Sequence, residues 1–294
     1  MAETWTIQRV LAWTSDYFKK KDLDAPRLTA ELLLAHALHC DRVRLYMDLD
    51  RPLQKEELAA YRALVERRAA GEPTFYLLGA KEFFGRRFAI DARVLTPRPE
   101  TELIVEAALE RLPADATGAV LDLCTGSGCI GLTLAAERPG LRVVATDASR
   151  DALEVARANA VALGVADRVD LVHGDLYAPV AGRTFRLIVS NPPYLESATI
   201  DRLRAEVRRE PRMALDGGKD GLDLLRKIVA GAPAALDPGG WMILEIGESQ
   251  GAALMGLFMG ANLTDGAIRK DLGGLERIAL ARLPQATTAA VPPQ

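Results

Sequence analysis

Residues 185–194 read FRLIVSNPPY, an apolar run that stops abruptly at two prolines. Its centre, residues 187–189, is short, rich in β-branched side chains and free of polar alternation, as is typical of a buried strand in a parallel sheet. Pro192 and Pro193 lack a backbone N–H and have a fixed φ, so they cannot continue the strand, and each holds its predecessor extended. We therefore predict a rigid loop where a parallel strand ends, the edge at which doubly wound sheets bind ligands.

The polar groups of this loop suit the binding of a planar NH2 group. The side-chain oxygen of Asn191 and the carbonyl of Pro192 can accept its two hydrogens, with Tyr194 stacked on its plane. Two such bonds orient the nitrogen lone pair outward and stabilise the positive charge that develops when the nitrogen attacks an electrophile. A simple turn is the competing interpretation, because asparagine and proline are common turn formers.

Strand-like and helix-like segments alternate from residue 119 onwards. Strands are expected at residues 120–123, 142–146, 169–173, 185–190 and 241–246, with helices at 129–137 and 149–163. This alternation predicts an α/β fold with a doubly wound, mostly parallel sheet and helices on both faces.

The first third of the chain has a different pattern. A stripe of Leu28, Leu32, Ala35 and Leu38 has helical spacing, and residues 75–95 resemble a β-hairpin that turns near Gly85. The expected segments are a helical substrate-recognition domain at 1–73, a β-hairpin linker at 74–98, the α/β domain at 99–284 and a disordered tail at 285–294. Packing against the α/β domain is the alternative use of the helices.

Composition narrows the class of protein. The chain has 294 residues, of which 49% are hydrophobic and 26% charged, and its formal net charge is -3. This charge argues against direct nucleic-acid binding, which usually needs a basic surface. No signal-peptide layout or membrane-length apolar run is present, so we expect a cytoplasmic protein without membrane association. Three cysteines and three histidines show no metal-ligand spacing, and we predict no metal site.

A second set of residues predicts a cofactor site. Residues 124–128 form a glycine-rich turn after the first strand, and an aspartate stands at or just after the end of each of three strands, namely Asp122, Asp147 and Asp175. A dinucleotide is one candidate, since residues 126–131 fit the G-x-G-x-x-G spacing. S-adenosylmethionine fits the carboxylates better, because it carries an ammonium and a sulfonium and no phosphate. We expect Asp147 at the ribose, Asp175 at the adenine and Asp122 behind the loop and the methionine end.

Several motifs in the same order resemble the release-factor glutamine N5-methyltransferase family over nearly the whole chain. They are EP at 72–73, YLLG at 76–79, TPRPETE at 96–102, DLCTGSG at 122–128, IVSNPPY at 188–194, EP at 210–211, GGKDGL at 217–222 and EIG at 245–247. The resemblance implies a class I, Rossmann-like methyltransferase domain after a small α-helical bundle. It also implies that S-adenosylmethionine is consumed to methylate the glutamine amide in the Gly-Gly-Gln motif of class I peptide chain release factors.

The resemblance also implies roles for individual residues. Asn191, Pro192 and Tyr194 would be catalytic, and with Pro193 they would bind the substrate glutamine. The cofactor would contact Asp122, Cys124, Thr125, Gly126, Ser127, Gly128, Asp147, Asp175, Leu176 and Asn191. Cys124 stands where this family often has glycine, and Leu176 where some members place an aromatic residue against adenine.

Three alternative functions also fit parts of the sequence. A cysteine at position 124 is also a feature of glutamine methyltransferases that act on a large-subunit ribosomal protein. N6-adenine methylation of nucleic acid presents the same planar NH2, but it needs a basic groove and base flipping. The arginines of residues 202–212 could supply a contact surface or a solvated helix face. A non-catalytic scaffold is disfavoured because Asn191 and the glycine loop are both present.

We expect a monomer whose partner is a release factor.

Overall fold

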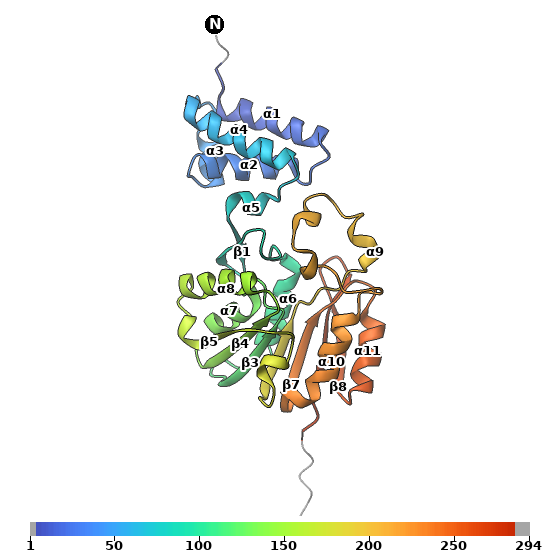
Figure 1. Ribbon diagram of the computed structural model, residues 1–294. Coiled ribbons are helices and arrows are strands. Elements are labelled where there is room, and N and C mark those ends of the chain that lie inside the picture. The colour runs from blue at the N-terminus through green and yellow to red at the C-terminus, as the bar shows by residue number, and fades with distance from the viewer. Residues whose placement is uncertain (1–3, 286–294) are drawn as a thin grey trace, which may run out of the picture. The chain divides into compact units, whose positions relative to one another are not determined.

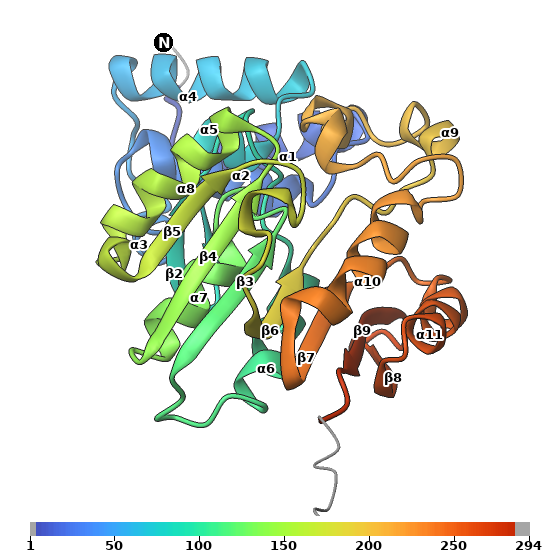
Figure 2. The ribbon, with the colours of Figure 1, turned by 60° about the horizontal axis from the view of Figure 1, so that its bottom comes forward.

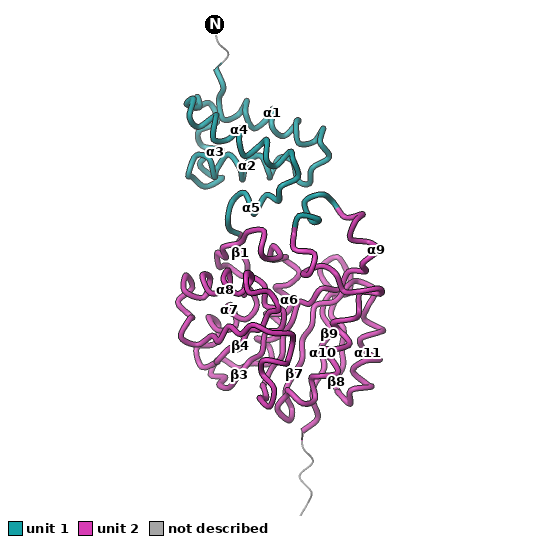
Figure 3. The backbone as a smooth tube through the Cα atoms, viewed as in Figure 1, with its two compact units in different colours: residues 1–80, 204–209 teal, residues 81–203, 210–294 magenta. Residues whose placement is uncertain are grey.

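The computed structural model describes residues 4–285, which divide into two compact units. The first unit ends at Ala80 and also includes Arg204–Arg209, and the second holds Lys81–Leu203 and resumes at Glu210 (Figure 3). Nearly all of the expected disordered tail, residues 286–294, lies outside the described part of the chain.

The first unit is a helical bundle (Figure 1). Its helices are α1 (Ile7–Lys20), α2 (Pro26–Ala37), α3 (Arg42–Met47), α4 (Lys55–Ala69) and α5 (Thr74–Leu78). Local signals start them: Thr6 and Asp41 cap α1 and α3 through their side chains, and Pro26 occupies the first turn of α2. Leucine and phenylalanine side chains from three helices form the fully buried centre, among them Leu11, Phe18, Leu33, Leu34 and Leu45.

A segment distant in sequence completes this unit. The buried guanidinium of Arg68 in α4 pairs with Glu206, and Arg204 pairs with Asp24 at 3.0 Å. Arg209 donates to the carbonyl of Ala70. This part of the arginine-rich stretch is therefore neither a continuous helix nor a free cationic surface, because the helical unit supplies its partners.

A short hairpin opens the second part of the chain. Strands β1 (Ala80–Phe83) and β2 (Arg86–Ala89) flank a turn at Gly85, whose φ is +69°. Phe83 and Phe88 meet edge to face across it at 6.0 Å, and both are buried. Residues 74–78, which the sequence pattern placed with the hairpin, form helix α5 instead. That helix begins after Pro73 and ends at Gly79 in the left-handed conformation.

The larger sheet has seven strands in the order β5-β4-β3-β6-β7-β9-β8, part of which can be followed in Figure 2. They are β3 (Gly118–Leu123), β4 (Leu141–Asp147), β5 (Val169–His173), β6 (Phe185–Ser190), β7 (Leu236–Glu245), β8 (Thr264–Lys270) and β9 (Glu276–Arg282). Strands β3 to β7 are parallel, and β9 pairs antiparallel with both β7 and β8. The doubly wound, mostly parallel sheet predicted from the alternation is confirmed.

Alternate residues of each strand enter two separate cores, as the two-residue period of a strand requires. Val120 and Leu187 face a core formed with α6 (Glu102–Leu109), α7 (Cys129–Glu137) and part of α8 (Arg150–Ala162). Leu121 and Ile188 face the opposite core with α10 (Asp223–Ala235) and α11 (Gly251–Gly260). Because both faces are covered, the open edge formed by the carboxyl ends of the strands is left for a ligand. None of the helices within residues 4–285 combines the length and apolar character that crossing a bilayer demands.

Phe88→Ala tests the link between the hairpin and the core. Phe88 is fully buried in the core that contains α6 and α7, so its removal should lower the free energy of unfolding by about 3–5 kcal/mol in a denaturant titration. Val161→Ala, at an exposed position of α8, is the control and should change it by less than about 0.5 kcal/mol. Equal effects of the two substitutions would contradict the placement of Phe88.

Candidate functional site

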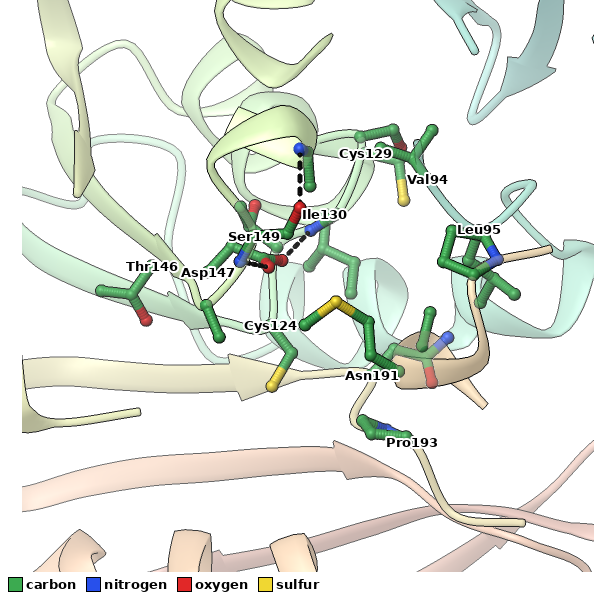
Figure 4. A pocket seen from close by; sticks show the side chains of 18 of the residues that line it. Val94, Leu95, Cys124, Cys129, Ile130, Thr146, Asp147, Ser149, Asn191 and Pro193 are labelled. Atoms are coloured by element: carbon green, nitrogen blue, oxygen red, sulfur yellow. Dashed lines mark hydrogen bonds between the residues drawn. The ribbon is translucent and has the colours of Figure 1, made fainter. Parts of the chain in front are cut away.

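A pocket lies where β3, β4 and β6 end, and Figure 4 shows it with Asp147 on one side and the loop of Asn191 and Pro193 on another. Nine of the residues predicted from the sequence line it: Cys124, Thr125, Gly126, Ser127, Asp147, Asp175, Leu176, Asn191 and Pro193. Four others do not, namely Asp122, Gly128, Pro192 and Tyr194. The first group comes from loops of four strands that the parallel sheet brings to one edge.

The glycine-rich loop after β3 is held tightly in shape. Thr125 donates its N–H to the carbonyl of Thr146 at 3.0 Å, and Gly128 donates to Thr125 at 2.8 Å. Gly126 and Gly128 have φ values of +55° and +82°, which glycine adopts without steric cost. Cys124 has a φ of +57° as well, and for a residue with a Cβ this conformation is unfavourable.

Asp122 supports this loop from behind rather than facing the pocket. Its carboxylate is fully buried and accepts hydrogen bonds from the hydroxyl of Thr125 at 2.6 Å and from the N–H of Gly131 at 3.0 Å. A Cβ on Gly131 would lie 2.8 Å from the same carboxylate oxygen, so only glycine lets α7 approach this closely. Burial raises the pKa of Asp122 to about 7.

Asp147, the last residue of β4, presents a half-buried carboxylate to the pocket. Its oxygens accept from the N–H groups of Gly126 at 2.9 Å and Ser149 at 2.8 Å, which joins the loops after β3 and β4. Burial raises the pKa of Asp147, while these two bonds favour its charged form. Asp175 follows β5 and is exposed, and the buried Leu176 beside it supplies an apolar wall. The arrangement provides two carboxylates around an apolar slot.

The loop after β6 is fixed by side chains from two other segments. Asn191 donates its Nδ2–H to the hydroxyl oxygen of Thr101 at 3.1 Å, and Thr101 donates to Glu245 Oε2 at 2.6 Å. Tyr194 donates its hydroxyl to the other oxygen of Glu245 at 3.1 Å. Ser190 completes the anchoring by donating to the carbonyl of Leu123 at 2.7 Å. The loop is therefore held to the start of α6 and to the ends of β3 and β7.

Thr101 and Glu245 were not among the residues predicted for the site. Both lie in motifs that the sequence displays, TPRPETE at 96–102 and EIG at 245–247. Thr101 lines the pocket although it is almost fully buried, and Glu245 is buried behind it. The motifs marked the segments, but only the fold shows that these two residues converge on Asn191.

A third motif, GGKDGL at 217–222, supports the same loop. Gly217 donates its N–H to the carbonyl of Leu195 at 2.8 Å, and a Cβ there would lie 2.8 Å from the carbonyl oxygen of Pro193. The side chain of Gln250 donates to the carbonyls of Tyr194 at 3.1 Å and Gly221 at 3.2 Å. Glycine is required here because two backbone segments lie in direct contact.

Two further loops border the pocket. Pro97, from the segment before α6, and Pro211 and Met213, from the connection between β6 and α10, all line it. The Arg98 guanidinium pairs with the buried Glu210 carboxylate at 2.6 Å and ties these two loops together. Within residues 4–285, no group of histidine, cysteine and acidic side chains is arranged to hold a metal ion.

The fold is that of the Rossmann-like methyltransferases. The hMettl16 catalytic domain in complex with a MAT2A 3′UTR hairpin has a TM-score of 0.58 and 17% identity, covering 76% of this chain and 83% of that chain. A methyltransferase from Pyrococcus furiosus has a TM-score of 0.52 and 20% identity, covering 69% and 92%. At these identities the likeness concerns the fold alone.

Sequence comparison defines the family more narrowly. Residues 9–79 match the PrmC N-terminal domain, and residues 101–219 match the methyltransferase small domain. The release factor glutamine methyltransferase of Geobacter sulfurreducens is 46% identical over 282 residues, which cover 96% of this chain and 98% of that protein. The protein of the same name from Cereibacter sphaeroides is 47% identical over 265 residues, covering 90% and 94%. The chain belongs to the release factor glutamine methyltransferase family, as the resemblance of its motifs predicted.

Cys124 offers a test of the loop geometry. Cys124→Ala keeps a Cβ in the left-handed conformation, whereas Cys124→Gly removes it, so the glycine variant should be the more stable of the pair by about 1–2 kcal/mol. Thermal and denaturant unfolding of the two variants would measure this difference. An alanine variant as stable as the glycine variant would show that residue 124 is not held at positive φ.

Proposed function

We propose that the protein transfers a methyl group from S-adenosylmethionine to the side-chain amide nitrogen of the glutamine in the Gly-Gly-Gln motif of class I release factors. One observation carries this proposal: the side-chain oxygen of Asn191 and the carbonyl oxygen of Pro192 receive no hydrogen bond from residues 4–285, although Asn191 itself is fixed by Thr101. Two free acceptors on a rigid loop match the two hydrogens of an amide. The relatives from Geobacter sulfurreducens and Cereibacter sphaeroides are named release factor glutamine methyltransferases.

The pocket fits a cationic cofactor with a ribose. Asp147 and Asp175 supply negative charge and hydrogen-bond acceptors, and Leu176 offers an apolar surface for a base. Arg93, the one cation among the described lining residues, is already paired with Asp91 at 2.7 Å and Glu154 at 3.0 Å. S-adenosylmethionine, when bound, supplies an electrophilic methyl group on a sulfonium that leaves as a neutral thioether.

The residues of the loop after β6 supply orientation and charge stabilisation. Asn191 and the Pro192 carbonyl accept the two amide hydrogens, which turns the nitrogen lone pair toward the methyl group and stabilises the positive charge that forms on nitrogen. Tyr194 does not line the pocket, and it supports this loop through the bond of its hydroxyl to Glu245. Burial and the neighbouring Glu245 raise the pKa of Tyr194, so its phenol stays neutral and does not act as a base. The surplus proton leaves the nitrogen after transfer.

The net charge of the chain and the contacts of its arginines favour a protein substrate over a nucleic acid. The formal net charge is -3, and Arg204, Arg209 and Arg212 are engaged by Asp24, a backbone carbonyl and Asp216 respectively. Adenine methylation in nucleic acid would need a basic groove, whereas these arginines are engaged within the chain. We further propose that the protein acts in the cytoplasm as a monomer on the release factor, without contacting nucleic acid directly.

A labelling assay tests the proposed substrate. Purified protein with tritiated S-adenosylmethionine should label a class I release factor and should not label its Gln→Ala variant in the Gly-Gly-Gln motif. The large-subunit ribosomal protein and duplex DNA, offered in parallel, should remain unlabelled. Label that persists in the Gln→Ala release factor, or that appears only on ribosomal protein or DNA, would overturn the assignment.

Two substitutions should separate the two halves of the site. Asn191→Ala removes an acceptor for the amide and should lower kcat about 100-fold or more, while the Kd for S-adenosylmethionine changes only a few-fold. Asp147→Ala removes a charged acceptor and should weaken cofactor binding by about 10-fold or more. Calorimetry and initial rates measure these effects.

Arg157→Ala, on the exposed side of α8, is the control for both substitutions and should match the wild type. Near-normal turnover of Asn191→Ala would refute the role given to Asn191. Unchanged cofactor affinity of Asp147→Ala would refute the role given to Asp147.

A further inference from the structure

A buried carboxylate reaches the catalytic loop through a single hydroxyl group. Glu245 ends β7 and is only 1% exposed, and its two oxygens are occupied by the hydroxyls of Thr101 and Tyr194. In its ionised form Glu245 has no hydrogen to give, and both hydroxyls donate to it. The direction of every bond in this cluster is therefore set by Glu245.

This direction determines which atom of Asn191 can face Thr101. Because the Thr101 hydroxyl donates its only hydrogen to Glu245, it can only accept a hydrogen bond from Asn191. The Asn191 amide donates its Nδ2–H to the Thr101 oxygen at 3.1 Å. The flipped amide would place Oδ1 against the Thr101 oxygen, and two acceptors with no hydrogen between them repel each other.

Asn191 Oδ1 is consequently left for the pocket. Within the described chain no protein donor reaches this oxygen, and Asn191 is half-buried among the lining residues. An asparagine side chain is nearly symmetric in shape, so packing alone hardly distinguishes its two orientations. The polarity of the Glu245–Thr101 bond does distinguish them.

We propose that Glu245 and Thr101 are positioning residues that hold the Asn191 amide with its oxygen toward the substrate, and that this polarity makes the site select an amide over a carboxylate of the same shape. The inference rests on the proposed function and deepens it by naming what the site rejects. A glutamine NH2 gives hydrogens to Asn191 and to the Pro192 carbonyl. A glutamate in its place would bring a charged acceptor against the oxygens of Asn191 and Pro192, which are acceptors too. A buried polar site rejects such a mismatched ligand strongly.

The test compares two forms of the release factor on three forms of the enzyme. The wild-type release factor gives kcat and KM, and a variant with Gly-Gly-Glu in place of Gly-Gly-Gln is the competing inhibitor that gives Ki. With wild-type enzyme we expect Ki to exceed KM by about 100-fold or more. Thr101→Val, which is close in size but cannot accept from Asn191, should lower kcat by about 10-fold or more and should lower Ki by about fivefold or more.

Thr101→Ser is the matched variant, because it keeps the hydroxyl. Its kcat and its Ki should both return most of the way to the wild-type values. A variant that had merely lost packing or fold would not bind the Gly-Gly-Glu release factor more tightly. A lower Ki therefore distinguishes a positioning role of Thr101 from a purely structural one. Glu245→Gln, which removes the acceptor-only constraint at nearly constant shape, is measured in the same way and keeps the test decisive if Thr101→Val does not fold. The Kd for S-adenosylmethionine, measured on every variant, should stay within about twofold of the wild-type value, since none of these groups is assigned to the cofactor.

The outcomes separate the two levels of the proposal. Failure of the wild-type enzyme to methylate the release factor would overturn the proposed function itself. Normal methylation by wild type, with wild-type kcat and Ki in the folded variants of Thr101 and Glu245, would overturn the positioning role alone. A lower kcat with an unchanged Ki would also overturn it, because selection between amide and carboxylate would then not depend on the orientation of Asn191.

Discussion

The hydrogen bonds that converge on the buried carboxylate of Glu245 join three separate segments of the chain. They connect the end of β7 to the start of α6 through Thr101, and to the loop after β6 through Tyr194. Burial raises the pKa of Glu245, and the two donated bonds favour its charged form. A buried carboxylate must be satisfied in this way or it becomes costly, so the same contacts that stabilise the sheet edge also give the loop after β6 one geometry.

Much of the fold follows from the sequence because its main signals are local. Short apolar runs separated by helical segments define the parallel strands, and Pro192 with Pro193 fixes where β6 stops. Other elements depend on contacts that no local pattern reveals. Strands β8 and β9 were not predicted, because they lie at the antiparallel edge, where β9 pairs with β7 and β8 pairs only with β9. Residues 204–209 belong to the helical unit only through partners such as Arg68.

The site was predicted in part for the same reason. Residues at strand ends, such as Asp147 and Asn191, meet at one edge because parallel strands all end there. Asp122 and Tyr194 also come from these ends, yet their side chains turn away from the pocket and support loops. The part played by Thr101 and Glu245 could not be read from spacing, since it arises from a contact between residues 144 positions apart. Sequence motifs thus identified the segments, and the fold identified the interactions.

We propose that Asn191 and Pro192 hold a glutamine amide by its two hydrogens while Thr101 fixes the orientation of Asn191. A crystal structure of the protein with S-adenosylhomocysteine and a class I release factor would test it most directly. We expect the glutamine amide nitrogen within about 3.2 Å of both Asn191 Oδ1 and the Pro192 carbonyl oxygen, with Asn191 Nδ2 still bonded to Thr101. A glutamine side chain held by other groups, or an Asn191 amide turned with Nδ2 toward the substrate, would contradict it.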